Sequence, residues 1–202
     1  QSGQKIVNIV VSPRYEGERF AQEKVIDVSE SVFAKISEEA APQGILAVLQ
    51  MPQNTVRPPE GKCLLLDGLA DPGNLGTIIR TANAAGYTEI YLKNCTDPYA
   101  PKCVRSAMSG IFFVRLFRID SLGDLFSGIP LLCADMDGEN VFDFRPPEKF
   151  CLVIGNEANG VTPDVRAQCA HVVRIPMRAS CESLNAGVSA GILMYQLAGG
   201  KV

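Results

Sequence analysis

Short apolar runs alternate with longer amphipathic segments over most of the chain. After residue 61 the runs are rich in β-branched residues, which is typical of buried strands in a parallel sheet with helices between them. The pattern predicts strands at residues 63–67, 89–92, 112–118, 130–134, 151–154 and 171–175. It predicts helices at residues 75–85, 103–109, 121–127, 162–169 and 184–198. The predicted fold class is therefore α/β with a mostly parallel sheet.

The residues before this sheet show a shorter alternation of apolar runs and amphipathic segments. Their pattern predicts strands at residues 7–11 and 45–49 and helices at residues 17–24 and 29–39. Ser29 is the candidate N-cap of the second helix, because a serine hydroxyl accepts a hydrogen bond from a backbone N–H of the first turn. This module is too short for a complete domain, so we expect a partial one.

A proline-rich segment separates the two parts. Residues 57–61 read RPPEG, and paired prolines continue neither a helix nor a central strand. We therefore predict a linker at residues 57–61, an N-terminal domain over residues 1–56 and a second domain over residues 62–202.

Composition narrows the classes of protein. A hydrophobic content of 47% over 202 residues suits a sizeable buried core. The seven cysteines are scattered without a CxxC pair, which indicates free thiols in a reducing compartment. No apolar stretch approaches the roughly 20 residues of a membrane span, so we expect a cytoplasmic protein without a membrane partner. A net charge of −3 argues against a protein that only coats nucleic acid.

Three segments carry candidate chemistry, and each follows a predicted strand, at the edge where open α/β sheets bind ligands. The first is residues 71–82, DPGNLGTIIRTA, a glycine-containing segment that runs into a helix. On its own it is an ordinary turn between a strand and a helix, with Arg80 on a solvated helix surface.

The second segment is residues 155–160, GNEANG, directly after an apolar run. It fits neither the GxGxxG pattern nor the Walker lysine pattern, so phosphate binding by a glycine-rich loop is poorly supported. Closely approaching backbone amides can still hold an uncharged part of a ligand. Glu157 by itself is explained as a carboxylate at the start of a helix.

The third segment is residues 175–185, IPMRASCESLN. It leads into a helix with small residues at Gly187, Ala190 and Gly191, and such residues let another backbone or a flat ligand approach closely. By itself the segment is explained by Ser183 as an N-cap and by ordinary helix packing.

Taken together and in this order, the patterns NxGxxxR, GNExxG and IPM followed by ESLN resemble the three motifs of the SpoU family of RNA 2′-O-ribose methyltransferases, in the SPOUT superfamily. The resemblance covers residues 63–200. Residues 41–48, APQGILAV, also look like the end of that family's ribosomal-protein-like substrate-binding domain. Ala179 stands where the family usually has glycine, and Ala186 and Gly187 replace the commoner valine and serine.

The resemblance implies a C-terminal trefoil knot of the SPOUT type in the α/β domain, preceded by a partial ribosomal-protein-like α/β domain. It implies transfer of a methyl group from S-adenosylmethionine to a ribose 2′-hydroxyl of structured RNA, with no metal ion. A separate substrate module favours ribosomal RNA over transfer RNA by family analogy. The family also works as a homodimer whose second subunit completes the RNA site, and the small face of the last helix agrees with that expectation.

Carried over position by position, the resemblance assigns two groups of residues. Those expected to surround the reacting ribose are Asn74, Arg80, Glu157, Ser183 and Asn185. Those expected to hold S-adenosylmethionine, largely through backbone groups, are Gly155, Asn156, Ile175, Met177 and Leu184. Methyl transfer is an in-line displacement, so orienting the 2′-oxygen is a major demand on the first group.

Arg80 is the residue that the family pattern nominates to activate the hydroxyl. A guanidinium is effectively always protonated in proteins, which disfavours a role as a simple base. We favour the hypothesis that Arg80 grips the adjacent phosphate and stabilises developing alkoxide charge, while another group or water accepts the proton.

Other interpretations stay open at this point. The main alternative is a non-catalytic RNA-binding or ribosome-assembly protein that keeps the fold, and its support is Ala179, which strains the loop if a positive φ is required there. A third class is a methyltransferase acting on small molecules or proteins. The lone His171 lies in an apolar strand without metal-binding partners in the pattern, which favours a structural role. A catalytic cysteine lacks a matching histidine loop.

Overall fold

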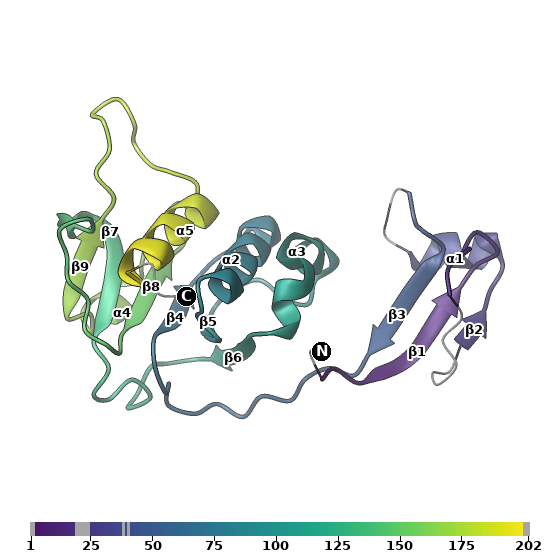
Figure 1. Cartoon of the computed structure of the whole chain (residues 1–202). Coiled ribbons are helices and arrows are strands. Elements are labelled where there is room, and N and C mark those ends of the chain that lie inside the picture. Colours follow the sequence, from purple (N-terminus) through teal and green to yellow (C-terminus); the bar gives the residue numbers. More distant parts are fainter. Residues whose placement is uncertain (1–2, 19–24, 38, 40, 200–202) are drawn as a thin grey trace. The chain divides into compact units, whose positions relative to one another are not determined.

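The chain divides into two units, Gln1–Gln53 and Asn54–Val202. The computed structural model describes residues 3–18, 25–37, 39 and 41–199 (Figure 1). No helix in this described part of the chain is both long and apolar enough to cross a membrane.

The N-terminal unit is a three-stranded sheet with one helix. Strands β1 (Ile6–Val11), β2 (Val25–Asp27) and β3 (Ile45–Leu49) lie in the order β2-β1-β3. β1 is parallel to β2 and antiparallel to β3. Helix α1 (Glu30–Ile36) begins at Ser29, whose hydroxyl accepts a hydrogen bond of 3.3 Å from a first-turn backbone N–H. The predicted N-cap is therefore confirmed.

Parts of this unit differ from the predicted pattern. The sequence pattern does not predict β2, because its three residues are all exposed and carry no alternation. The helix predicted at residues 29–39 ends at Ile36. Most of the helix predicted at residues 17–24 lies outside the described residues, and Gly17 and Glu18 are not helical.

The second unit is built on one parallel sheet. Its strands are β4 (Cys63–Asp67), β5 (Glu89–Lys93), β6 (Arg115–Ile119), β7 (Leu131–Asn140), β8 (Cys151–Gly155) and β9 (His171–Arg174). They lie in the order β6-β5-β4-β8-β7-β9, and all their pairings are parallel. The predicted mostly parallel α/β sheet is confirmed, and each predicted strand overlaps an observed one.

Helices flank this sheet (Figure 1). They are α2 (Pro72–Ala84), α3 (Pro101–Ala107), the short 3₁₀ helix η1 (Met108–Phe112), α4 (Pro163–Arg166) and α5 (Ala186–Leu197). The helix predicted at residues 121–127 is wrong, because residues 123–128 form successive turns. Gly123 and Gly128 have positive φ values of 47° and 79°, which a right-handed helix does not accommodate. α4 is also shorter than the predicted helix at residues 162–169.

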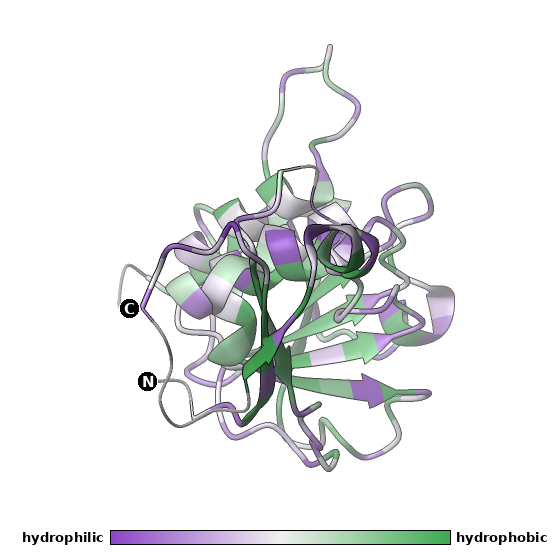
Figure 2. Cartoon of the chain, turned by 90° about the vertical axis from the view of Figure 1, so that its right-hand side faces the viewer, coloured by the Kyte–Doolittle hydropathy of each residue, from purple (hydrophilic) through white to green (hydrophobic). Residues whose placement is uncertain are grey.

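Alternate residues of the central strand are buried against two layers. Leu64 and Leu66 of β4 belong to a core that includes residues of α2 and α5. Cys63 and Leu65 belong to a second core that includes Val165 of α4. β4 and β5 are buried along their whole length, and Figure 2 shows green, hydrophobic stretches on the strands. Burial on both faces leaves the strand ends and their loops as the place for polar chemistry.

The small face of α5 packs inside the chain. A side-chain carbon added at Gly187 would lie 3.1 Å from the methyl group of Thr77 in α2. One added at Gly191 would lie 3.6 Å from the methyl group of Thr81, and Ala190 is fully buried. Packing against α2 of the same chain therefore accounts for these small residues without a second chain.

The proline-rich segment is fastened to the second unit. Arg57 pairs with the buried carboxylate of Glu89 at 2.9 Å, and the backbone N–H of Glu60 donates to the other oxygen of Glu89 at 3.0 Å. Arg115 of β6 also pairs with Glu89, at 3.2 Å. The Tyr91 hydroxyl donates to the carbonyl oxygen of Arg57 at 2.9 Å. Residues 57–60, here called the strap, are therefore fixed to the amino ends of β5 and β6.

Candidate active site

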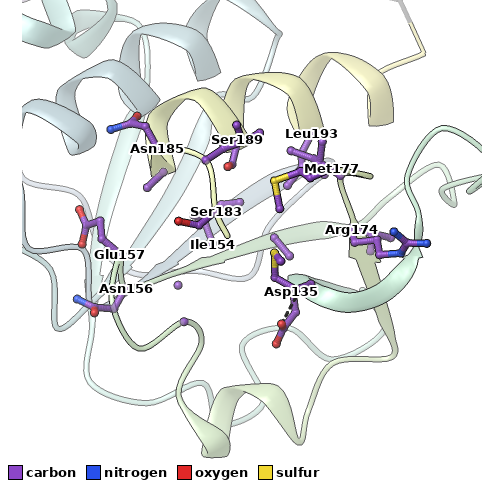
Figure 3. Close-up of a pocket in the computed structure, with 18 of the residues that line it drawn as sticks. Asp135, Ile154, Asn156, Glu157, Arg174, Met177, Ser183, Asn185, Ser189 and Leu193 are labelled. Carbon is purple, nitrogen blue, oxygen red and sulfur yellow. Dashed lines mark hydrogen bonds between the residues drawn. The ribbon is translucent and has the colours of Figure 1, made fainter. Parts of the chain in front are cut away.

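A cavity of about 490 Å³ lies at the carboxyl edge of the sheet (Figure 3). Nine of the ten predicted site residues line it, namely Asn74, Gly155, Asn156, Glu157, Ile175, Met177, Ser183, Leu184 and Asn185. The exception is Arg80. The volume falls within the roughly 300–1,000 Å³ of small-molecule sites. The fold thus brings together three motifs that are far apart in the sequence.

A series of side-chain hydrogen bonds joins the three motifs at one end of the cavity. Asn185 Nδ2 donates to Asn74 Oδ1 at 2.8 Å, and Asn74 Nδ2 donates to Glu157 Oε1 at 3.0 Å. Asn185 Oδ1 accepts from the backbone N–H groups of Gly187 and Val188 and thereby caps α5. Because the cap fixes Nδ2 of Asn185 as the donor, Asn74 must turn its own Nδ2 toward the carboxylate. Asn185, Asn74 and Glu157 are here called the relay.

Glu157 is held as a carboxylate. The backbone N–H groups of Ala70 and Asp71 each donate to one of its oxygens at 3.3 Å, in addition to Asn74. Partial burial alone would raise the pKa of Glu157, but these hydrogen bonds outweigh it, so the pKa lies below its usual value. Glu157 is therefore a fixed negative charge at neutral pH rather than a base tuned to that pH.

The first motif is the start of a helix rather than a loop. α2 begins at Pro72, after Asp71, whose carboxylate accepts from the Asn74 N–H at 2.8 Å. This cap places Asn74 in the first turn, beside the cavity. Gly76 has a packing role, since an added side-chain carbon would lie 2.4 Å from the carbonyl oxygen of Cys103 in α3. The glycine of this motif therefore allows a close approach of two helices.

The second motif is a tight loop closed on itself. Asn156 and Gly160 exchange two backbone hydrogen bonds of 2.9 Å. Asn156 Oδ1 accepts from the N–H groups of Ala158 and Asn159, and Nδ2 donates to the carbonyl oxygen of Gly68 at 2.8 Å. Asn156 was predicted as a cofactor-binding residue, and it does line the cavity. Its side-chain polar atoms, however, hold the loop together.

The third motif forms a wall of the cavity and then extends away from its unit (Figure 1). Ile175 and Met177 follow β9 along the cavity, and Ser183 and Leu184 return to it before α5. Ala179, in the exposed segment between them, does not have a positive φ. The alanine at this position therefore causes no left-handed strain, which removes the support for a non-catalytic protein.

Arg80 lies outside the cavity of its own chain. It is exposed on α2, six positions after Asn74, which places it about 9 Å further along the axis and on another face of the helix. Among the described residues its guanidinium has no ion-pair or hydrogen-bond partner. Its backbone is tightly packed, since a side-chain carbon added at Gly110 would lie 3.0 Å from Arg80 Cα. One chain therefore does not bring Arg80 to the relay.

The cavity also contains residues that the motifs do not predict. They are Ala134, Asp135, Met136, Ile154, Gly160, Val173, Arg174, Ala186, Ser189 and Leu193. Asp135 and Arg174 lie at the end opposite the relay (Figure 3). Asp135 reaches the cavity because β7 is irregular, its pairing with β9 passing from Ala134 directly to Glu139. Gly138 is the signal for this irregularity, since an added carbon there would lie 2.6 Å from the β9 backbone.

The other candidate groups lie apart from the relay. His171 is exposed on β9, with its ring centroid 5.3 Å from that of Phe144. All seven cysteines are free, and six of them are at least partly buried. Within the described ranges, no group of three or more His, Cys, Asp or Glu residues is placed to hold a metal ion.

The fold and the cavity define an α/β domain with a small-molecule site at the carboxyl edge of a parallel sheet. Residues 61–195 of this domain match the family described as SpoU rRNA Methylase. The chain belongs to this family, and the match includes all three motifs.

Similar proteins include two methyltransferases of known name. The chain is 35% identical over 180 residues to the 23S rRNA (guanosine(2553)-2′-O)-methyltransferase RlmP of Bacillus subtilis (strain 168), covering 85% of this chain and 71% of that protein. It is 34% identical over 172 residues to the 23S rRNA (uridine(2479)-2′-O)-methyltransferase of Streptomyces viridochromogenes, covering 77% of this chain and 60% of that protein. The chain therefore spans roughly two thirds of the length of these relatives.

A solved structure supports the fold over nearly the whole chain. The SpoU methyltransferase AviRb from Streptomyces viridochromogenes, in complex with the cofactor AdoMet, is similar with a TM-score of 0.88 and 27% identity. The similarity covers 99% of this chain and 84% of that one.

Proposed function

We propose that this protein transfers a methyl group from S-adenosylmethionine to a ribose 2′-hydroxyl of structured RNA, with ribosomal RNA favoured over transfer RNA. The observation that carries the proposal is the relay, which joins all three motifs at the end of one cavity. Two similar proteins named as 23S rRNA 2′-O-methyltransferases support ribosomal RNA as the substrate.

The cavity suits the proposed cofactor chemically. Apolar side chains such as Ile154 and Leu193 favour a purine ring over water, and the carboxylates of Glu157 and Asp135 favour a cationic ligand. When bound, S-adenosylmethionine supplies a methyl group attached to a positively charged sulfur. In this proposal the residues that hold it are Gly155, Asn156, Ile175, Met177 and Leu184. The similar structure with AdoMet bound supports the choice of cofactor.

The relay residues orient the ribose in this proposal. Asn74 and Asn185 each keep one Nδ2–H that the relay does not use, and Ser183 adds a hydroxyl at the same cavity. These donors can hold the oxygens of a ribose. Because Glu157 and the α5 cap fix both amides, the donors are oriented before RNA binds, which favours in-line attack by the 2′-oxygen.

Arg80 supplies fixed positive charge in this proposal. Its guanidinium stays protonated, so it grips the phosphate next to the reacting ribose and stabilises the negative charge that develops on the 2′-oxygen. The proton of the hydroxyl passes to water or to another group at the site.

We further propose a homodimer, because one chain does not supply Arg80 to its own cavity. Val188 and Tyr195 of α5 are 51% and 46% exposed, and they are the apolar residues that a second copy covers. Light scattering is expected to give about twice the chain mass of 21.8 kDa. The family's trefoil knot and a cytoplasmic location complete the proposal, and the free cysteines suit a reducing compartment.

Transfer of a labelled methyl group tests the proposed function. The purified protein is incubated with S-adenosylmethionine carrying a labelled methyl group and with ribosomal RNA, ribosomal particles or transfer RNA. Mass spectrometry of the digested RNA is expected to find the label in 2′-O-methylnucleosides of ribosomal RNA. Label on a base or on protein contradicts the proposed reaction. RNA binding without calorimetric binding of S-adenosylmethionine favours the non-catalytic alternative.

A further inference from the structure

Asp67 is a buried carboxylate at the carboxyl end of the central strand β4. Its side chain has no exposed surface. In the sheet it is the register partner of Lys93 in β5 and of Gly155 in β8. Gly155 is the residue after which the chain enters residues 156–161, here called the Glu157 loop. Asp67 therefore lies beside the start of this loop.

The same carboxylate also binds the residue that ends the loop. Asp67 Oδ2 accepts from the backbone N–H of Thr162 at 2.8 Å and from the Thr162 hydroxyl. Asp67 Oδ1 accepts from Lys93 Nζ at 3.2 Å. Thr162 directly follows the loop and is the N-cap of α4. One residue thus holds both ends of the Glu157 loop, the start through strand pairing and the end through its side chain.

The residues that follow Asp67 contact the interior of the loop. The carbonyl oxygen of Gly68 accepts from the Asn156 side chain at 2.8 Å. The N–H groups of Ala70 and Asp71 donate to the Glu157 carboxylate at 3.3 Å. The end of β4 therefore meets the loop at its start, at Glu157 and at its end.

Stability alone does not require the pair between Asp67 and Lys93. A buried ion pair recovers little more than its desolvation cost, and apolar residues of similar volume are often as stable. Burial alone would lower the pKa of Lys93, but Asp67 and Asp164 raise it above its usual value, so the lysine stays charged. Lys93 therefore compensates the charge of Asp67, and it also donates a long hydrogen bond of 3.4 Å to the Thr162 hydroxyl. The two shorter bonds from Thr162 to Asp67 fix the end of the loop.

We propose that Asp67 is a positioning residue that fixes the Glu157 loop and thereby directs Glu157 toward Asn74. Asp67 is not among the residues that line the cavity, so it acts through Thr162 and the loop. The inference rests on the proposed function, because the direction of Glu157 matters there for holding the ribose.

Two variants separate positioning from charge compensation. Lys93→Met keeps the bonds between Asp67 and Thr162 but leaves a buried carboxylate without its cation. Asp67→Leu/Lys93→Met removes both charges and leaves Thr162 without its acceptor. Asp97→Asn is the matched control, because Asp97 follows the next strand and pairs with Arg118 at the surface. The three readouts are melting temperature, amide hydrogen exchange of a peptide spanning the loop, and turnover of RNA at saturating cofactor.

Between the single and the double variant, the melting temperature and the order of the loop are expected to change in opposite directions. Lys93→Met lowers the melting temperature, while loop exchange stays close to that of the unmodified protein. The double variant melts at a higher temperature than Lys93→Met, but its loop exchanges about 10-fold faster because the hydrogen bonds to Thr162 are lost. Its turnover falls at least about 10-fold because Glu157 is displaced. The control changes neither exchange nor turnover.

Normal hydrogen exchange of the loop in the double variant overturns the proposal. The proposal is also overturned if turnover falls only in proportion to the melting temperature across the variants. Hydrogen exchange needs no RNA substrate. If the unmodified protein methylates no RNA, the proposed function fails, while exchange still decides whether Asp67 fixes the loop.

Discussion

The two ends of β5 each bury a charged residue, and the two clusters around them hold different parts of the chain. At the amino end, Glu89 is 3% exposed and pairs with Arg57 and Arg115. At the carboxyl end, Lys93 is 5% exposed and pairs with Asp67. The first cluster fastens the strap, and the second fastens the Glu157 loop beside the cavity.

Similar chemistry therefore has different consequences at the two edges of a parallel sheet. All strands of such a sheet end at the same edge, so the loops there converge on one place. A buried carboxylate at that edge determines the geometry of a site. A buried carboxylate at the opposite edge contributes to stability. Substitutions at the two edges therefore separate loss of activity from loss of stability.

The largest effect on turnover is expected for a glycine-to-alanine substitution at the carboxyl edge of the sheet. In Gly155→Ala the new carbon would lie 2.1 Å from the Gly160 carbonyl carbon, whereas a carbon added at Gly61, at the amino edge, has no neighbour within 4 Å. We expect Gly155→Ala to displace the loop and to lower turnover by at least about 100-fold. Calorimetry should show weaker cofactor binding. Gly61→Ala is the control and should keep normal turnover and cofactor binding. Normal activity of Gly155→Ala would contradict the expected difference between the two edges of the sheet.

Arg80→Ala is expected to lower turnover by about 100-fold, the scale of other fixed charges that act in the transition state. Cofactor affinity should be unchanged, because Arg80 is outside the cavity. Arg80→Lys keeps the charge but loses the planar fork, so its activity should be intermediate. Rates and calorimetric affinities measured together test this, and an Arg80→Ala protein with full turnover removes Arg80 from the site.

Mixing two inactive proteins sharpens the result for Arg80. If Arg80 acts on the partner's cavity, dimers that combine one Arg80→Ala chain with one Gly155→Ala chain contain one complete site. Randomly exchanged chains in equal amounts should then recover about a quarter of the normal turnover. If Arg80 instead acts in the cavity of its own chain, neither variant chain has a complete site. The mixture then recovers no turnover.

At the amino edge the expected effect is on stability. Glu89→Gln removes the buried carboxylate that Arg57 and Arg115 share, although Arg57 keeps its surface pair with Glu60. We expect the free energy of unfolding to fall by about 2 kcal/mol. For a chain of this length the melting temperature then falls by about 4–8 °C. Turnover per folded molecule should stay normal. Glu148→Gln, at an exposed position, is the matched control. Loss of turnover without loss of stability would contradict the division between the edges.

The smallest effect concerns acid pH. Because the pKa of Glu157 is lowered in the folded chain, its carboxylate favours folding above the usual glutamate pKa. This contribution is lost as the pH falls through the lowered pKa. The melting temperature of the unmodified protein should therefore exceed that of Glu157→Gln near neutral pH, and the difference should shrink as the solution is acidified. A difference that grows in acid means that the folded-state pKa is raised instead.

Periodicity predicts the sheet because its strands are buried on both faces and read as apolar runs. It fails at β2, whose three exposed residues are held by pairing with β1 and not by burial. It also fails at residues 121–127, where Leu122 and Phe126 have helix-like spacing. Both are buried, but Gly123, between them, and Gly128, after them, have positive φ values and turn the chain.

The candidate site, like the fold, is predicted from the sequence only in part. The motifs correctly predict nine residues that line the cavity, because those residues lie at or just beyond the carboxyl ends of strands, in the first turn of α2 or directly before α5. Asp135 and Arg174 are not nominated, since their position depends on the irregular pairing of β7 with β9. Arg80 is separated from the relay because it lies on another face of α2 from Asn74. A sequence motif gives the spacing of these residues but not the direction of their side chains.

The link between Asn185 and Asn74 spans 111 positions of the sequence. Closing so long a separation costs chain entropy, so we expect the link to form late in folding. Asn185 also begins α5, the last helix described. While the protein is being synthesised, a chain that already contains Asn74 and Glu157 still has no relay until α5 has been made and has docked on α2. A partly made chain therefore has no working site, and RNA near the translating ribosome is not modified by it.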